Sequence, residues 1–179
     1  MTTSAPTVGW IGLGNIGLPM ARRVLAAGLP LHVWARRRET AAPLVDAGAS
    51  LAENPETLAR ACDVIATIVG GPDDVRELHR RMAPRARPGT VFVDMTTASP
   101  GNARESGELA ALAGAFAIDA PVTGGVAGAT QGALTSFVGG DADALARARP
   151  VLEAFCKRIV PCGPAGSGSV RRTAPGASR

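Results

Sequence analysis

The chain has few aromatic residues and almost no lysine. Of its 179 residues, 3% are aromatic, none is tyrosine, and Lys157 is the single lysine. Since proteins that bind nucleic acids by base stacking need aromatic platforms, this composition argues against that class. The net charge of +4 comes almost wholly from arginines, most of which are spread along predicted helices as solvated faces usually are. We therefore expect no nucleic-acid partner.

The cysteines and the apolar segments exclude further classes of protein. Cys62, Cys156 and Cys162 show no metal-ligand spacing, so we expect no metal site and reduced thiols. No apolar run approaches the ~20 residues that cross a bilayer. The first six residues also lack the basic-then-apolar pattern of a signal peptide. These features predict a soluble, cytoplasmic protein with no membrane partner.

Short apolar runs alternate with longer helical segments, which is the pattern of βαβ units on a parallel sheet. We predict strands over residues 8–11, 31–34, 64–69, 91–94, 116–119, 136–138 and 159–160. Helices are predicted over residues 16–27, 40–47, 55–61, 73–82, 102–113 and 141–155. Gly28, Gly48 and the pair Asn54-Pro55 stand where helix-capping residues are expected. The sequence therefore predicts the α/β class with a Rossmann-like, doubly wound, mainly parallel sheet.

One domain accounts for most of the chain. Residues 8–162 hold all of the predicted strands and helices, with no internal linker or repeat. Residues 1–7 carry no such pattern, and we expect them to form a disordered N-terminus. Residues 163–179 are rich in Gly, Ser, Pro and Arg and have almost no aliphatic side chains, which predicts an irregular tail.

The first predicted strand runs into a G-x-G-x-x-G motif and then into a helix. Its glycines are Gly12, Gly14 and Gly17. In dinucleotide-binding domains the first allows a tight turn, the second lets the backbone approach the pyrophosphate, and the third lets the helix pack closely on the strand. The N–H groups and the dipole of the helix start favour the anion. A lone motif could be an ordinary glycine-rich turn, but the flanking strands and helix favour dinucleotide binding.

The end of the second predicted strand favours NADP(H) over NAD(H). An NAD site usually has Asp or Glu about 20 residues beyond the glycines, where it binds the ribose 2′-hydroxyl. This position holds Ala35, followed by Arg36, Arg37 and Arg38, and the first carboxylate is Glu39. A guanidinium group is a planar, permanently charged donor, which suits a 2′-phosphate. The alternative is a solvated basic loop that happens to follow a strand.

Four segments in order resemble the β-hydroxyacid dehydrogenase family, which includes 3-hydroxyisobutyrate dehydrogenase, tartronate semialdehyde or glyoxylate reductase, and the NADP-binding domain of 6-phosphogluconate dehydrogenase. They are the glycine motif at 11–21, a V-x-N-R-like segment at 33–36, a D-x-S-[ST]-x-x-P-like loop within 88–100, and a D-A-P-V-S-G-G-like segment at 119–125. Ala35 replaces the usual asparagine of the second segment, although Arg36 remains. The likeness runs from about residue 8 to residue 168.

The resemblance also implies which residues bind ligands. The loop within 88–100 would lie beside the nicotinamide, and the segment at 119–125 would bind the carboxylate of a small substrate, partly through backbone N–H groups. The implied cofactor residues, for NADP, are Gly12, Leu13, Gly14, Asn15, Ile16, Gly17, Arg36, Arg37, Val69, Gly70 and Thr97. The implied substrate residues are Thr96, Thr123, Gly124 and Gly125.

The resemblance ends after Gly168. Family members continue with G-x-G-x-x-x-K-x-x-N-[NQ], in which the lysine protonates the substrate oxygen, and then with an all-helical domain. Here the lysine position is Arg172, and the asparagine positions hold Pro175 and Gly176. Because arginine keeps its proton, it is a poor general acid, and we assign no catalytic residue. We expect a chain truncated or frame-shifted near 168–169, without the helical domain and most of the family's homo-oligomer contacts.

Two functions remain open at this point. The first is an NADP-dependent enzyme that interconverts a small β-hydroxyacid and its semialdehyde or ketoacid. The second is a catalytically inactive cofactor-binding fragment or remnant, which the replacement of the lysine favours. Binding of NADPH fits both functions, whereas oxidation of NADPH by a small semialdehyde fits only the first.

Overall fold

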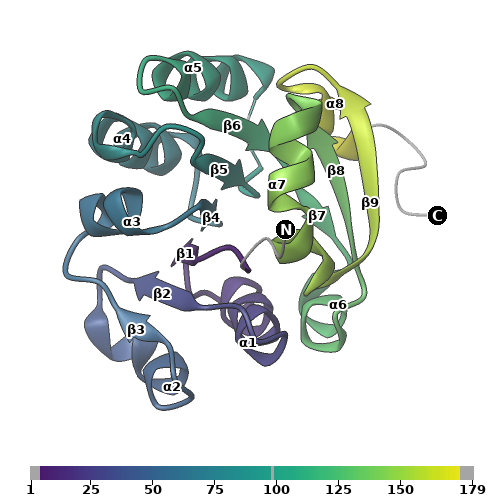
Figure 1. Cartoon of the computed structure of the whole chain (residues 1–179). Helices are drawn as coiled ribbons and strands as arrows, with labels where there is room; N and C mark the ends of the chain where they lie inside the picture. The colour runs from purple at the N-terminus through teal and green to yellow at the C-terminus, as the bar shows by residue number, and fades with distance from the viewer. Residues whose placement is uncertain (1–4, 98, 174–179) are drawn as a thin grey trace.

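The computed structural model describes residues 5–97 and 99–173 as a three-layer α/β fold (Figure 1). One sheet forms the middle layer, and an apolar core lies on each of its faces. The helices that pack into the first core are α1 (Gly17–Ala26), α2 (Ala42–Val45), α6 (Gly125–Gln131) and α7 (Ala142–Glu153). The helices that pack into the second core are α3 (Pro55–Ala61), α4 (Pro72–Met82) and α5 (Pro100–Ala111). The predicted fold class is confirmed.

The described residues contribute nine strands to this sheet. They are β1 (Val8–Ile11), β2 (Leu31–Trp34), β3 (Ser50–Leu51), β4 (Val64–Thr67), β5 (Val91–Asp94), β6 (Phe116–Asp119), β7 (Val122–Thr123), β8 (Leu134–Gly139) and β9 (Cys156–Gly163). Six run parallel in the order β3-β2-β1-β4-β5-β6, and β8, antiparallel to β6, adds β7 and β9. From β1 the chain first adds β2 and β3 on one side and then adds β4, β5 and β6 on the other side, so the strand order changes direction between β1 and β4. Ligands of open α/β sheets bind at such a switch point.

The local sequence signals describe most of these elements correctly. The strands β1, β2, β5 and β6 and the helix α3 begin and end where predicted. Gly28 and Gly48 have left-handed φ values of 78° and 110° after their helices. Asn54 caps α3, since its Oδ1 accepts a hydrogen bond of 2.9 Å from the Thr57 N–H. The other predicted elements are present with shifted ends, and the helix expected over 40–47 is a 3₁₀ turn, η1 (Arg38–Ala41), followed by α2.

The sequence pattern does not predict β3, β7 and α6. The two strands have two residues each, which is too short for a periodic pattern. The helix α6 contains two glycines in seven residues, and glycine disfavours a helix by roughly 1 kcal/mol relative to alanine. Packing against α1 and β8 therefore decides the conformation of α6, not local propensity.

The expectation of an irregular tail from residue 163 is wrong for α8 (Ser167–Thr173), which is helical. The buried carboxylate of Asp119 accepts hydrogen bonds from the Gly166 N–H (2.7 Å) and the Ser169 N–H (2.9 Å). Because these partners lie about 50 positions away along the chain, the local composition gives no sign of this capping. Residues 174–179, the rest of the expected tail, lie outside the described residues.

The expectation of disorder over residues 1–7 is also wrong at its end. The Thr7 N–H donates to Asp63 Oδ2 at 2.8 Å, and the Thr7 carbonyl accepts from the Asp63 and Val64 N–H groups at 2.9 and 3.2 Å. These bonds tie Thr7 to the start of β4, so Thr7 has a fixed place in the fold. Residues 1–4 lie outside the described residues.

Candidate functional site

The turn between β1 and α1 has the close backbone approaches that a G-x-G-x-x-G motif predicts. Gly12 has a φ of +103°, and a Cβ atom there would lie 1.8 Å from the carbonyl oxygen of Ile68. At Gly17 a Cβ atom would lie 2.1 Å from the carbonyl oxygen of Gly12. Neither position accommodates a side chain, because backbone atoms fill the space. The assigned roles of these two glycines, a tight turn and close helix packing, are therefore seen in the structure.

Buried side chains and backbone bonds hold this turn in place. Trp10, fully buried at the end of β1, donates from Nε1 to the Gly12 carbonyl oxygen at 2.9 Å. Its ring also meets the Phe155 ring edge-to-face, with 5.8 Å between centroids. The Ile68 N–H donates to the Ile11 carbonyl oxygen at 2.9 Å, which fixes the chain after β4 against the turn. The glycine turn is thus built on two central strands of the sheet.

A cavity of about 660 Å³ opens at the carboxyl ends of β1, β2 and β4. Gly14 lines it and has no atom within 4 Å of where its Cβ would be, so a ligand's phosphates can approach the backbone there. Ten of the eleven predicted cofactor residues line this cavity: Gly12, Leu13, Gly14, Asn15, Ile16, Gly17, Arg36, Arg37, Val69 and Gly70. The remaining residues of its lining are Ala35, Thr40, Ile68, Asp74 and Leu78. The sequence positions that the resemblance selects thus converge on one place.

The cavity contains a carboxylate that the sequence analysis missed. Asp74, in the first turn of α4, forms an ion pair with Arg36 at the end of β2. The Asp74 side chain is 31% exposed and that of Arg36 is 68% exposed. A search for acids about 20 residues beyond the glycines cannot find Asp74, which lies 38 positions after Arg36. Because β4 lies beside β1, the residues that follow β4 face the same cavity, and this topology was the available signal.

The loop after β5 is fixed by a buried carboxylate. Asp94 Oδ1 accepts hydrogen bonds from the Thr96 N–H (2.9 Å) and from the Thr67 hydroxyl (3.3 Å). The Thr96 hydroxyl in turn accepts a 3.1 Å bond from the Val69 N–H. Burial raises the pKa of Asp94 to about 6, although its hydrogen bonds act in the opposite direction. Thr96, a predicted substrate residue, is 5% exposed and joins this loop to the cavity wall at Val69.

Thr97 lies outside the lining of the cavity and faces α8. Its hydroxyl accepts a hydrogen bond of 2.6 Å from a terminal nitrogen of Arg172. The Nε atom of Arg172 is buried and has no hydrogen-bond partner in the structure. Arg172 occupies the position where the resemblance implies a lysine, so the structure brings a guanidinium, not an amine, to this loop.

The remaining predicted substrate residues lie at the junction of β7 and α6. Thr123 pairs with Thr135 of β8, and its side chain is half-buried. Gly124 and Gly125 have φ values of 128° and 64°, and both are exposed. A Cβ atom on Gly124 would lie 2.9 Å from Leu134 Cδ2, so this turn also requires glycine. The structure gives the predicted carboxylate-binding turn its glycine geometry, and its role in binding stays a prediction.

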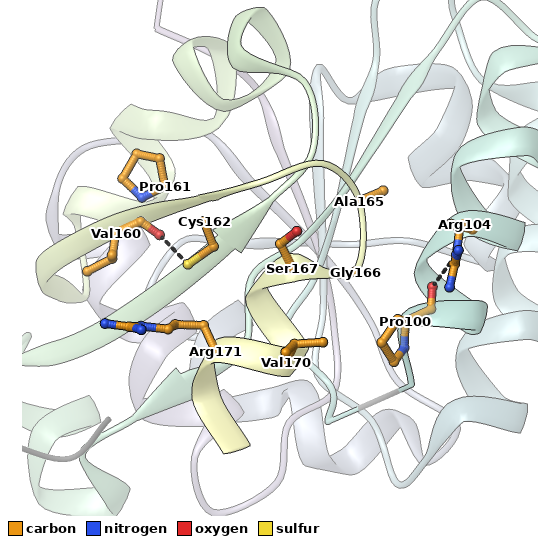
Figure 2. Close-up of a pocket in the computed structure, with 10 residues that line it drawn as sticks. All are labelled: Pro100, Arg104, Val160, Pro161, Cys162, Ala165, Gly166, Ser167, Val170 and Arg171. Atoms are coloured by element: carbon orange, nitrogen blue, oxygen red, sulfur yellow. Dashed lines mark hydrogen bonds between the residues drawn. The ribbon is translucent and has the colours of Figure 1, made fainter. Parts of the chain in front are cut away.

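A second cavity, of about 620 Å³, lies between β9, α8 and the start of α5 (Figure 2). Figure 2 shows Val170 of α8 beside Pro100 of α5, and Cys162 of β9 farther along the lining, beyond Ser167. Arg104 and Arg171 add positive charge to the lining. This cavity shares no lining residue with the glycine-turn cavity, so the two are separate sites on the molecule.

Residues 5–97 and 99–173 contain no group of His, Cys, Asp and Glu placed to hold a metal ion. Within the same residues, no helix combines the length and the apolar character needed to span a bilayer. All three cysteines are free thiols. Burial raises the pKa of Cys62 and of Cys156 to about 12, which makes both thiols poor nucleophiles.

The sequence matches a family model along nearly its whole length. Residues 7–163 match the model described as the NAD binding domain of 6-phosphogluconate dehydrogenase. The chain belongs to this family. The matched residues include the glycine turn, the cavity at the ends of β1, β2 and β4, and the segment at 119–125.

Three further proteins are similar to this chain over a little more than half of their own length. The NAD-dependent L-serine dehydrogenase of Pseudomonas aeruginosa is 38% identical over 92% of this chain and 56% of its own length. A solved structure of Mycobacterium tuberculosis 3-hydroxyisobutyrate dehydrogenase with L-serine has a TM-score of 0.89 and 35% identity, over 94% of this chain and 58% of that one. The structure of Psf3 in complex with NADP+ and 2-OPP has a TM-score of 0.86 and 34% identity, over 92% and 59%. The chain spans about half the length of the curated relatives that it matches.

Proposed function

We propose that this chain binds NADP(H) in the glycine-turn cavity, as part of an oxidoreductase that acts on a small β-hydroxyacid or on its semialdehyde or ketoacid. The observation that carries the proposal is the convergence of Gly14, the start of α1, Arg36 and Arg37 on one cavity. A bound nicotinamide dinucleotide would supply the hydride for such a reaction. The backbone around Gly14 would contact the pyrophosphate, and the two arginines would contact the 2′-phosphate.

The relatives support a nicotinamide cofactor and differ in which one they use. One is described as NAD-dependent and another is in complex with NADP+, so the family does not decide between the two. The preference for NADP(H) rests on Arg36 and Arg37. The small carboxylate substrate rests on the turn at Gly124 and Gly125, whose open backbone resembles the anion-binding turns of other proteins.

We also propose that this chain binds the cofactor without turnover at ordinary rates. Arg172 stands at the lysine position and donates to Thr97. A guanidinium holds its proton too tightly to deliver it to a substrate oxygen, and loss of a general acid lowers a rate by roughly 10²–10⁴-fold. The guanidinium can still bind an anion, because it offers several donors in one plane.

Titration of the purified chain with NADPH and with NADH, followed by calorimetry, tests the cofactor assignment. We expect both to bind, and NADPH to bind more tightly. The variant Arg36→Ala is expected to weaken NADPH binding by roughly 10- to 100-fold, as loss of one or two charge-assisted hydrogen bonds does. The matched control is Arg38→Ala, which changes an exposed neighbouring arginine outside the cavity lining. Absence of binding of either dinucleotide would overturn the proposal.

Oxidation of NADPH by glyoxylate and by small semialdehydes tests the second part. We expect no more than background oxidation with the unaltered chain. Steady turnover with kcat near 1–10³ s⁻¹, the range of typical enzymes, would contradict the assignment of Arg172 as a group that cannot donate a proton.

A further inference from the structure

The carboxylate of Asp74 lies in the cavity lining and is paired with Arg36, one of the two arginines proposed to bind the 2′-phosphate. Arg36 follows β2 and Asp74 belongs to α4, and the two side chains form an ion pair within the lining of the cavity. Asp74 also lies over the chain after β4, since a Cβ atom on Gly70 would be 3.0 Å from Asp74 Oδ2. The guanidinium that is proposed to bind the phosphate is thus already paired in the free protein.

The charges around this position are closely balanced. Arg37 adds a second cation to the cavity lining. On the other side of the ion pair, a smaller cavity of about 310 Å³ is lined by Asp74, Glu77 and Arg81, among others. Arg81 is held by Glu56 through two hydrogen bonds of 2.8 and 3.1 Å. The phosphate would therefore meet two arginines and, beside them, the uncompensated carboxylate of Asp74 once Arg36 turns to the ligand.

Folding stability does not explain why this pair lies where it does. Ion pairs between exposed side chains contribute little to stability, and Arg36 is mostly exposed. Asp73, the neighbouring residue, also forms an ion pair, with Arg76 at 3.1 Å, but its side chain is 92% exposed and outside the cavity lining. Asp74 is the acid of this helix start whose charge faces the proposed ligand.

We infer that Asp74 limits the preference of this chain for the phosphorylated dinucleotide. Its carboxylate competes with the 2′-phosphate for Arg36, and its negative charge also repels the phosphate. An unphosphorylated ribose leaves the ion pair between Asp74 and Arg36 intact. The inference rests on the proposed function, and it makes Asp74 a specificity-determining residue that keeps NAD(H) usable at a site with two arginines.

Calorimetric titrations of the full chain and of Asp74→Asn with NADPH and NADH test this inference. Removal of one like charge close to a phosphate is expected to tighten NADPH binding by about tenfold and to change NADH binding by less than about threefold. The NADPH effect should shrink near 1 M salt, where the Debye length falls to about 3 Å. The matched control, Asp73→Asn, removes the same charge one residue away and should leave both affinities unchanged. Circular dichroism and thermal melts confirm that each variant is folded.

The outcomes separate the inference from the function beneath it. If the unaltered chain binds neither dinucleotide, the proposed function fails. If it binds them but Asp74→Asn weakens NADPH or leaves it unchanged, the inference fails and the function stands, with Asp74 acting only to orient Arg36 or not at all. An equal gain with Asp73→Asn also overturns the inference, because the effect would then come from net charge alone.

Discussion

The two halves of the sheet's carboxyl edge are built in different ways. At the ends of β1, β2 and β4, backbone geometry shapes the glycine-turn cavity, with Gly12 and Gly17 packed against carbonyl oxygens. At the ends of β5 and β6, buried carboxylates and long-range contacts do this work: Asp94 fixes its own loop, Asp119 caps α8, and Thr97 meets Arg172 from 75 positions away. The first half depends on what glycines permit, and the second on side chains that reach across the fold.

The largest loss of stability is expected from the variant Gly12→Ala, which adds a methyl group to the turn after β1. Its Cβ would lie 1.8 Å from the Ile68 carbonyl oxygen at a φ of +103°. Overpacking and a left-handed backbone together should cost about 3–5 kcal/mol of folding free energy. A thermal melt or a urea titration of the purified variant measures this loss.

Gly14→Ala is the matched variant, because its Cβ would meet no atom within 4 Å. We expect its stability to change by less than about 1 kcal/mol. Its affinity for NADPH should nevertheless fall by roughly tenfold or more, since the added methyl would stand where the backbone is proposed to contact the pyrophosphate. Unchanged affinity in a folded Gly14→Ala would show that the phosphates do not lie over this residue.

A smaller loss is expected from Asp119→Ala in the second half. The change leaves the Gly166 and Ser169 N–H groups without their buried acceptor, at a cost of about 2–4 kcal/mol. Amide hydrogen exchange should rise first in α8, and the Arg172 contact with Thr97 should be lost with it. Asp141→Ala is the control: it removes an exposed cap of α7 and should cost about 1 kcal/mol. Equal exchange in α8 of both variants would contradict the capping role of Asp119.

The contrast between the halves also explains what the sequence could predict. The glycine turn, the strand before it and the helix after it are local patterns within about 20 residues, and each is present as predicted. Ten of the predicted cofactor residues meet in one cavity because they follow neighbouring parallel strands. These local patterns do not single out Asp74, because an acid in the first turn of a helix is also expected from its favourable interaction with the helix dipole.

The second half was less predictable for the opposite reason. Composition marks residues 163–179 as irregular, yet the Asp119 carboxylate organises part of them into α8. The strand β9 runs over eight residues, whereas the pattern predicts two. The charged, exposed residues Lys157 and Arg158 interrupt the apolar pattern of this strand, which among residues 5–97 and 99–173 pairs with β8 alone. Tertiary contacts decide both elements, and no local window contains them.

The last effect concerns pH, and it compares Asp94 in the second half with His79, a buried residue of α4. His79 is 1% exposed, its Nε2 has no hydrogen-bond partner in the structure, and burial lowers its pKa to about 4. Its neutral form is favoured by folding, so its contribution is present above the ordinary pKa of 6.5 and is lost as pH falls toward 4. Asp94, with its pKa raised from 3.8 to about 6, contributes below pH 3.8 and loses that contribution as pH rises through 6.

The two groups therefore oppose each other between pH 4 and 6, and variants should separate them. The variant Asp94→Asn lacks the contribution of Asp94, which stabilises the fold as pH falls. Its stability should therefore fall by up to about 3 kcal/mol more than that of the unaltered chain when pH is lowered from 6 to 4. In His79→Leu the sign reverses, and stability should fall by a similar amount, relative to the unaltered chain, as pH rises from 4 to 6. Urea unfolding at pH 4, 5, 6 and 7 measures both, and the carboxyl groups that all three proteins share cancel in the differences. If the unfolding free energies of the three proteins changed with pH in parallel, water would have to reach both side chains despite their burial. The loop after β5 would then be open to water at Asp94.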